Sequence, residues 1–167
     1  MTADELRALQ TPIKARYKDD PAAALKTLRA CGTLTGDNLI CSVMTDNGPI
    51  DAGLHPFVGG DGRSSCSGDM LLQALVACAG VTLQAVATAM AISLRGGTVS
   101  AEADLDFRGT LGVSKEVPAG FKAIRLSFDL DTDASSEQLA TLLKLTERYC
   151  VIYQTLKMPP EIAACIA

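Results

Sequence analysis

Six cysteines and one histidine are the residues of this sequence whose side chains could perform nucleophilic, redox or metal chemistry. The cysteines are Cys31, Cys41, Cys66, Cys78, Cys150 and Cys165. They form no Cys-x-x-Cys pair and no cysteine–histidine spacing typical of a zinc site. Because His55 is the single histidine, a His-based metal centre or a Ser-His-Asp triad would depend on that one residue.

Two cysteines differ from the other four because each is expected on a helix among apolar neighbours. Cys78 follows Ala77, and Cys150 lies between Tyr149 and Val151. Free cysteine is one of the most frequently buried residue types and often packs as a small apolar side chain. Helical spacing alone therefore leaves both packing and redox chemistry open for these two thiols.

An uncharged, apolar stretch over residues 70–94 predicts the long helix that carries the first of these two cysteines. Ser65 or Ser67 is expected to cap this helix, with Asp69 in its first turn, and Gly96-Gly97 to end it. The stretch is long enough to span a bilayer, but polar side chains interrupt it and it lacks a basic flank. We therefore expect the central helix of a globular core and no membrane partner.

The pattern from residue 135 onward predicts the helix that carries the second cysteine. Ser135 and Gln138 have the spacing of a capping box. The helix is expected to reach at least Cys150 and to end before Pro159-Pro160. Its inner stripe is expected to consist of Leu139, Leu142, Leu143 and Thr146.

Two pairs of strands are expected, which makes the chain a mixed α+β protein. Alternating apolar and polar residues over 99–107 and 124–131 predict an antiparallel pair. Residues 24–34 and 39–44 are expected to form two further strands, joined by a polar turn at 35–38.

The remaining segments are expected to be a loop and a helix. Residues 46–68, rich in glycine and proline, predict a long loop. Residues 3–18 predict a charged surface helix that is broken near Pro12. At 167 residues, the chain is expected to form a single domain over 1–167.

Composition and charge argue against several classes of protein. The formal net charge is −4, with no basic stripe that would attract nucleic acid. Acidic residues occupy the start of the chain, where a secretory signal would carry positive charge. Six cysteines are too sparse for a disulfide scaffold in a chain of this length. We therefore expect a cytoplasmic protein whose thiols are mostly reduced.

Two sequence blocks resemble the OsmC/Ohr family of osmotically inducible and organic hydroperoxide resistance proteins. The first block combines a glycine-rich loop, an acid and a Leu/Ala-rich helix with a cysteine. It runs Gly59-Gly60-Asp61-Gly62 and then Ser67-Gly68-Asp69-Met70-Leu71-Leu72-Gln73-Ala74-Leu75-Val76-Ala77-Cys78. The second block is Glu147-Arg148-Tyr149-Cys150-Val151. The resemblance extends over about 24–156, so residues 1–20 form a helical extension outside the family core.

The resemblance implies an OsmC-like α+β fold, with antiparallel sheets around long central helices and an intertwined homodimer. It also implies a thiol-dependent peroxidase that reduces organic hydroperoxides. Cys78 would be the peroxidatic nucleophile, and Cys150 the thiol that closes a disulfide with the resulting sulfenic acid. The disulfide would be reduced by an external dithiol, such as a lipoyl group, and no bound metal or cofactor is implied.

This chain departs from the family pattern at the group that activates the nucleophile. Peroxidases of the family place an arginine in the turn between the first two strands and hold it with a glutamate at the start of the cysteine helix. Here the turn at 35–38 contains no arginine, and Asp69 stands at the start of that helix. Nine residues at about 100° each would place Asp69 on the opposite side of an unbroken helix from Cys78.

Other residues could take over the activating role. The candidate cations are Arg29, Arg63, Arg108 and Arg148, and each could equally be a solvated surface charge. His55 is either a proton donor or a loop anchor. Thr82, one turn after Cys78, could offer its hydroxyl to the sulfur or bond back to the preceding helical turn.

Three alternatives to this site remain open. Cys66 could act in place of Cys150, because it lies just ahead of the cysteine helix. The chain could be a non-catalytic OsmC-like protein that binds an apolar small molecule or a thiol carrier. It could also be a structural dimer whose cysteines are incidental.

Overall fold

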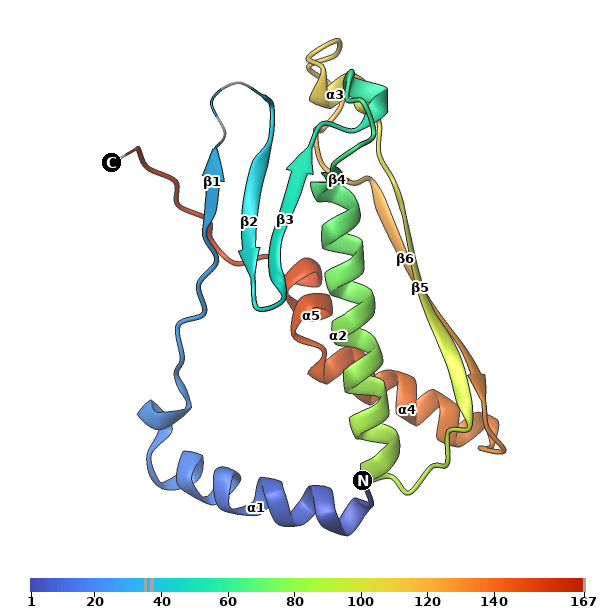
Figure 1. Cartoon of the computed structure of the whole chain (residues 1–167). Coiled ribbons are helices and arrows are strands. Elements are labelled where there is room, and N and C mark those ends of the chain that lie inside the picture. The colour runs from blue at the N-terminus through green and yellow to red at the C-terminus, as the bar shows by residue number, and fades with distance from the viewer. Residues whose placement is uncertain (35, 37, 167) are drawn as a thin grey trace. The chain divides into compact units, whose positions relative to one another are not determined.

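The computed structural model describes residues 1–34, 36 and 38–166 (Figure 1). Contacts within the chain divide it into two compact units. Unit 1 consists of residues 1–21, 74–100 and 127–167, and unit 2 of residues 22–73 and 101–126. Both candidate cysteines, Cys78 and Cys150, belong to unit 1.

Unit 2 contains a four-stranded sheet in the order β1-β2-β3-β4 (Figure 1). Its first three strands pair antiparallel, whereas β3 and β4 pair parallel. The strands and the two short 3-10 helices beside them are η1 (Pro21–Ala24), β1 (Gly32–Leu34), β2 (Cys41–Thr45), β3 (Gly48–Gly53), η2 (Pro56–Val58) and β4 (Ser65–Cys66).

The predicted hairpin of this sheet is confirmed, but its first strand is shorter than expected. Only β1 forms within the predicted range 24–34, and it pairs with β2 so that Leu34 lies opposite Cys41. Thr35 and Asp37, in the predicted turn, lie outside the described residues.

The long loop predicted over 46–68 is wrong, because β3, η2 and β4 form inside it. Gly48 and Pro49 disfavour a strand by propensity, yet β3 pairs with β2 from Gly48 to Ala52. Gly48 has a φ of 107°, which closes the tight β2–β3 turn and requires glycine. Tertiary pairing has therefore outweighed local propensity in this segment.

The second sheet consists of β5 (Gly96–Asp104) and β6 (Ala123–Asp131). The pair is antiparallel, as predicted, since the Arg95 N–H donates to the Asp131 oxygen at one end and the Lys122 N–H to the Asp104 oxygen at the other. The strand predicted over 99–107 ends three residues early. Phe107 and Arg108 instead belong to a one-turn helix, α3 (Phe107–Thr110), which Asp106 caps.

Helix α2 (Ser67–Ala89) is the predicted long apolar helix, and it places four buried residues in the interior: Leu75, Ala79, Leu83 and Ala87. It ends before the expected Gly96-Gly97. Ala91 takes a left-handed conformation with φ 54°, and the Ile92 N–H donates to the Ala87 oxygen at 2.9 Å. The left-handed residue that follows a helix is usually glycine. Because alanine occupies this position, no glycine marks the end of the helix in the sequence.

By length and composition α2 could also cross a membrane, the one such helix among the described residues. The core helix of a soluble protein passes the same test. Leu83, Ala87 and Ile92 join Leu142 in the hydrophobic cluster of unit 1. Packing within the protein therefore explains the apolar character of the α2 face that carries Leu83 and Ala87.

Helix α4 (Ser136–Tyr149) begins where predicted, with Ser135 and Gln138 forming both hydrogen bonds of the capping box. Leu142 and Thr146 are buried on its inner face. Leu143 is 44% exposed, so its place in the predicted inner stripe is wrong. The predicted reach to Cys150 is wrong by one residue, because α4 ends at Tyr149. After Cys150 a separate short helix begins, α5 (Val151–Lys157).

Helix α1 (Ala3–Asp19) forms the predicted N-terminal extension of unit 1. The expected break is wrong, because Pro12 lies inside one continuous helix. The turn that loses its hydrogen bond at Pro12 is exposed around Ala8, where water can satisfy the freed carbonyl group. Within α1, whose residues are all described, none is buried.

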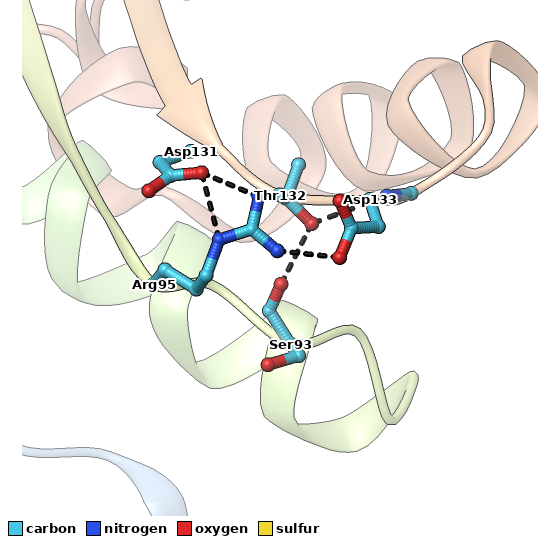
Figure 2. Close-up of polar contacts among 6 residues, drawn as sticks. Ser93, Arg95, Asp131, Thr132 and Asp133 are labelled. Carbon is cyan, nitrogen blue, oxygen red and sulfur yellow. Dashed lines mark hydrogen bonds and ion pairs between the residues drawn. The ribbon is translucent and has the colours of Figure 1, made fainter.

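Polar contacts of Arg95 join the start of β5 to the end of β6 (Figure 2). Its guanidinium donates to the carboxylates of Asp131 and Asp133. The Thr132 hydroxyl donates to the Ser93 carbonyl oxygen at 2.6 Å. These contacts tie the segment after α2 to the segment before α4, the two helices that position the cysteines.

Candidate functional site

The two cysteines reach one site from two different parts of the chain. Cys78 projects from the middle of α2 and is half-buried. Cys150 is fully buried and forms the junction between α4 and α5. Both are free thiols.

The backbone at Cys150 is extended, with φ −71° and ψ 111°, so the helix direction changes there. Its N–H donates to the Thr146 oxygen and closes α4, while its carbonyl oxygen accepts from the Gln154 N–H and opens α5, both at 2.9 Å. The first amides of α5 have no partner within their own helix, as at any helix start. They are free to bind a nearby acceptor.

Sulfur chemistry is concentrated at this junction, because the two thiols form a hydrogen bond with each other. Burial raises the pKa of Cys78, but donated hydrogen bonds outweigh it and lower the pKa below the ordinary value of cysteine. The donors are the Ile152 N–H, the Cys150 thiol, the Val151 N–H and the Thr82 hydroxyl. Hydrogen bonds to the thiolate favour the charged form in this way.

The pKa of Cys150 moves in the opposite direction. Burial raises the pKa of this thiol most, and the hydrogen bond and negative charge of Cys78 raise it further. The N–H groups of Tyr153 and Ile152 act against this change without reversing it. The site therefore combines two neighbouring thiols whose pKa values are changed in opposite directions, lowered at Cys78 and raised at Cys150.

Two other predicted residues, Thr82 and Arg148, belong to unit 1. Of these, Thr82 lies at the thiol pair, whereas the contact of Arg148 is with Tyr149. Thr82 supplies its hydroxyl to Cys78. The Arg148 guanidinium lies 5.5 Å from the centre of the Tyr149 ring and is exposed. The remaining predicted residues, Asp69, Arg29, Arg63, Arg108, His55 and Cys66, belong to unit 2.

Two of the candidate arginines in unit 2 have acidic partners there. Arg108 pairs with Asp106 at 2.6 Å, and hydrogen bonds from Arg108 lower the pKa of Asp106 to about 2. Arg63 lies 3.7 Å from Asp61. Arg29 is exposed on the segment before β1, which has no regular structure.

His55 has the contacts of a loop anchor. It caps η2, where its Nδ1 accepts a hydrogen bond from the Phe57 N–H at 3.1 Å. Its ring stacks on Phe107 with 5.0 Å between centroids. Asp69 is exposed in the first turn of α2, and Cys66 is half-buried in β4 opposite Gly53.

Sequence reasoning missed the backbone donors of the site. It sought a cation for Cys78, whereas the groups that lower the pKa include the peptide N–H groups of Val151 and Ile152. Every residue except proline has such a group, so residue type did not identify them. The helix break at Cys150, which frees these N–H groups for Cys78, is marked by neither glycine nor proline.

Comparisons with known proteins give a consistent family. The family model described as OsmC-like protein matches residues 60–164. An OsmC-like protein from Mycoplasma pneumoniae has a similar structure, with a TM-score of 0.67 and 16% identity over 80% of this chain and 89% of that one.

Two solved structures named as organic hydroperoxide resistance proteins are also similar. The protein from Elizabethkingia anophelis, which has thiocyanate bound, gives a TM-score of 0.64 with 17% identity, over 81% of this chain and 91% of that one. The protein from Legionella pneumophila gives 0.62 with 21% identity, over 80% and 91%. A search of curated proteins found no match.

At these identities the structures establish the α+β fold, with its small antiparallel sheets and long helix, and the resemblance seen in the sequence is confirmed. The family model matches well over half of the residues. The chain therefore belongs to the OsmC-like protein family.

Proposed function

We propose that this protein is a thiol peroxidase that reduces organic hydroperoxides, with Cys78 as the nucleophile and Cys150 as the resolving thiol. The observation that carries the proposal is that each thiol acts on the pKa of the other, which is lowered at Cys78 and raised at Cys150. The names of two structural relatives, which refer to organic hydroperoxide resistance, support the same chemistry.

The first step is attack by the Cys78 thiolate on the terminal oxygen of the hydroperoxide, ROOH. An S–O bond forms and the O–O bond breaks. The sulfur is oxidised to a sulfenic acid, and the departing alkoxide takes a proton from water to leave as the alcohol ROH. A lowered thiol pKa assists this step, because only the thiolate is an effective nucleophile.

The second step joins the two sulfurs. Cys150 attacks the sulfenic sulfur of Cys78, so that an S–S bond forms and the S–O bond breaks. The hydroxyl group and the Cys150 proton leave together as water. The bond closes a disulfide between α2 and the α4–α5 junction, where the thiols already interact.

Reduction of the disulfide requires an external dithiol, for which a lipoyl-type group is the proposed class. One thiolate of the reductant attacks the protein disulfide and its second thiol completes the exchange, which returns both cysteines to the reduced form. No bound metal or cofactor takes part in this scheme.

A steady-state assay tests the proposal. Cumene hydroperoxide consumption with dihydrolipoamide is expected for the unchanged protein and for Cys165→Ala, which alters an exposed cysteine near the C-terminus. Cys78→Ala is expected to abolish it, whereas Cys150→Ser is expected to allow one turnover and leave a sulfenic acid at Cys78. Equal consumption by the unchanged protein and Cys78→Ala would exclude the peroxidase and favour a non-catalytic binding protein.

We further propose that the protein works as a homodimer. The chain exposes 12608 Å² of surface, whereas a compact protein of 17.4 kDa exposes about 7900 Å². Even two separate compact bodies of half that mass would expose only about 9500 Å² in total. The excess of about 3000 Å² exceeds the roughly 1000–2500 Å² that one chain contributes to most obligate interfaces.

Apolar side chains make up part of this excess. Val81 on α2 is 71% exposed, and Leu9 and Ile13 on α1 are 58% and 46% exposed. Exposed apolar surface on this scale usually marks an association site. A second copy of the chain is the proposed partner, because a two-fold dimer would use the same apolar residues of α1 and α2 on both copies.

A further inference from the structure

The break between α4 and α5 changes the partners of two peptide groups. In a continuous α-helix the Val151 N–H would donate to the Glu147 oxygen, and the Ile152 N–H to the Arg148 oxygen. The extended backbone at Cys150 prevents both bonds. The two released N–H groups turn instead to the sulfur of Cys78.

The Glu147 carbonyl oxygen has a replacement donor. The side-chain amide Nε2 of Gln154 lies 2.6 Å from this oxygen and donates a hydrogen bond to it. The contact is partly buried, so an oxygen left without it would be incompletely solvated. A side chain from the first turn of α5 thus does what the Val151 N–H would do in an unbroken helix.

Gln154 is also held through its backbone. Its N–H donates to the Cys150 oxygen at 2.9 Å. The same residue therefore contacts the chain on both sides of the break, at Glu147 through its side chain and at Cys150 through its main chain. Two attachments of this kind fix the direction in which the first turn of α5 leaves Cys150.

We propose that Gln154 is a positioning residue, which holds the α4–α5 break open and so keeps Cys150 and the Val151 and Ile152 N–H groups directed at Cys78. This role rests on the peroxidase function proposed above, but the positioning itself can be measured without peroxide. Removal of the side-chain amide leaves the Glu147 oxygen to recapture the Val151 N–H. That recapture lengthens α4 through Cys150 and removes a donor from Cys78.

The test compares variants at this one position. Gln154→Met keeps a side chain of similar length but has no donor, and Gln154→Glu keeps the shape but offers only acceptors when ionised. Gln154→Lys restores a donor of similar reach. Thr155→Ala, at the exposed next residue of α5, serves as the matched control.

The readout is the pH dependence of Cys78 alkylation by iodoacetamide, followed on the Cys78 peptide by mass spectrometry. The titratable neighbour in contact with this thiol is Cys150, whose peptide is followed in the same samples. The alkylation midpoint of Cys78 is expected to rise by about one pH unit in Gln154→Met and Gln154→Glu, which corresponds to about a tenfold loss of thiolate at lower pH. Gln154→Lys and Thr155→Ala are expected to stay close to the unchanged protein.

A purely structural role predicts a different pattern. Gln154→Met would then unfold at lower urea concentration while the Cys78 midpoint stayed where it was, and this result would overturn the proposal. If Gln154→Met does not fold, the Glu and Lys variants decide, since equal midpoints in those two would also overturn it. Absence of peroxide consumption by the unchanged protein would remove the proposed function without affecting the alkylation result.

Discussion

The buried thiol of Cys150 donates a hydrogen bond to Cys78, and the pKa values of these two groups move apart. Two identical side chains are thereby distinguished by the direction in which their surroundings change the pKa. The division arises because Cys78 receives several donors from the α4–α5 junction and from Thr82, whereas Cys150 receives fewer and is more buried. This is the arrangement that two-step thiol oxidation requires.

The first prediction concerns the order in which the two thiols ionise. Because its pKa is lowered, Cys78 becomes thiolate as the pH rises through a value below that of ordinary cysteine, and its reactivity then reaches a plateau. The raised pKa of Cys150 keeps that thiol protonated until higher pH. Alkylation of the two peptides against pH measures both midpoints. A lower midpoint for Cys150 than for Cys78 would reverse the assigned roles.

The Thr82 hydroxyl gives the second prediction. Thr82→Val keeps the side-chain shape but removes the donor to Cys78, so the Cys78 midpoint is expected to rise by about half a unit and the peroxide rate at neutral pH to fall about threefold. Thr88→Val is the matched control, because the Thr88 hydroxyl donates to the Gln84 oxygen at 2.8 Å. Equal effects of the two substitutions would show that Thr82 acts only through helix stability.

A neighbouring pair of leucines on α4 tests the packing of unit 1. Leu142 is 1% exposed and belongs to the hydrophobic cluster, so Leu142→Ala is expected to lower the free energy of unfolding by about 2–5 kcal/mol. Leu143→Ala, at a residue that is 44% exposed, is expected to cost about 1 kcal/mol or less. Urea unfolding of both variants measures the difference. Similar losses would mean that the inner face of α4 is wrongly assigned.

Oligomeric state is the subject of the fourth prediction. Light scattering after size-exclusion chromatography is expected to give twice the 17.4 kDa mass of one chain. Val81→Glu places a charge on an apolar residue exposed on α2 and is expected to shift the protein toward the monomer. Lys115→Glu, on an exposed loop residue, is expected to leave the dimer intact. A monomer of the unchanged protein at micromolar concentration would contradict the proposed dimer.

Local signals predicted the fold well where a single mechanism determined the structure. The capping box of Ser135 and Gln138 marked the start of α4, and strict alternation marked β6 and most of β5. Prediction was wrong where partners elsewhere in the chain decided the outcome. The strand β3 forms despite Pro49 because β2 supplies its pairing partner. Helix α2 ends at Ala89, and the left-handed Ala91 that follows is a conformation that its residue type would not suggest.

The candidate site shows the same limit at the level of chemistry. Resemblance drew attention to Cys78 and Cys150, and the structure brings their thiols together. The donors at Cys78 could not be named, since peptide groups look alike in every sequence and become available only through the bend at Cys150. Gln154 had no motif to mark it, because its bond to Glu147 depends on that same bend.

Peptide mapping of the non-reduced protein after one equivalent of cumene hydroperoxide tests the central claim most directly. The predicted result is a single new species in which the Cys78 and Cys150 peptides are joined by a disulfide, while Cys31, Cys41, Cys66 and Cys165 remain reduced. Reduced thiols at both Cys78 and Cys150, or a disulfide that joins Cys78 to Cys66 instead, would contradict it.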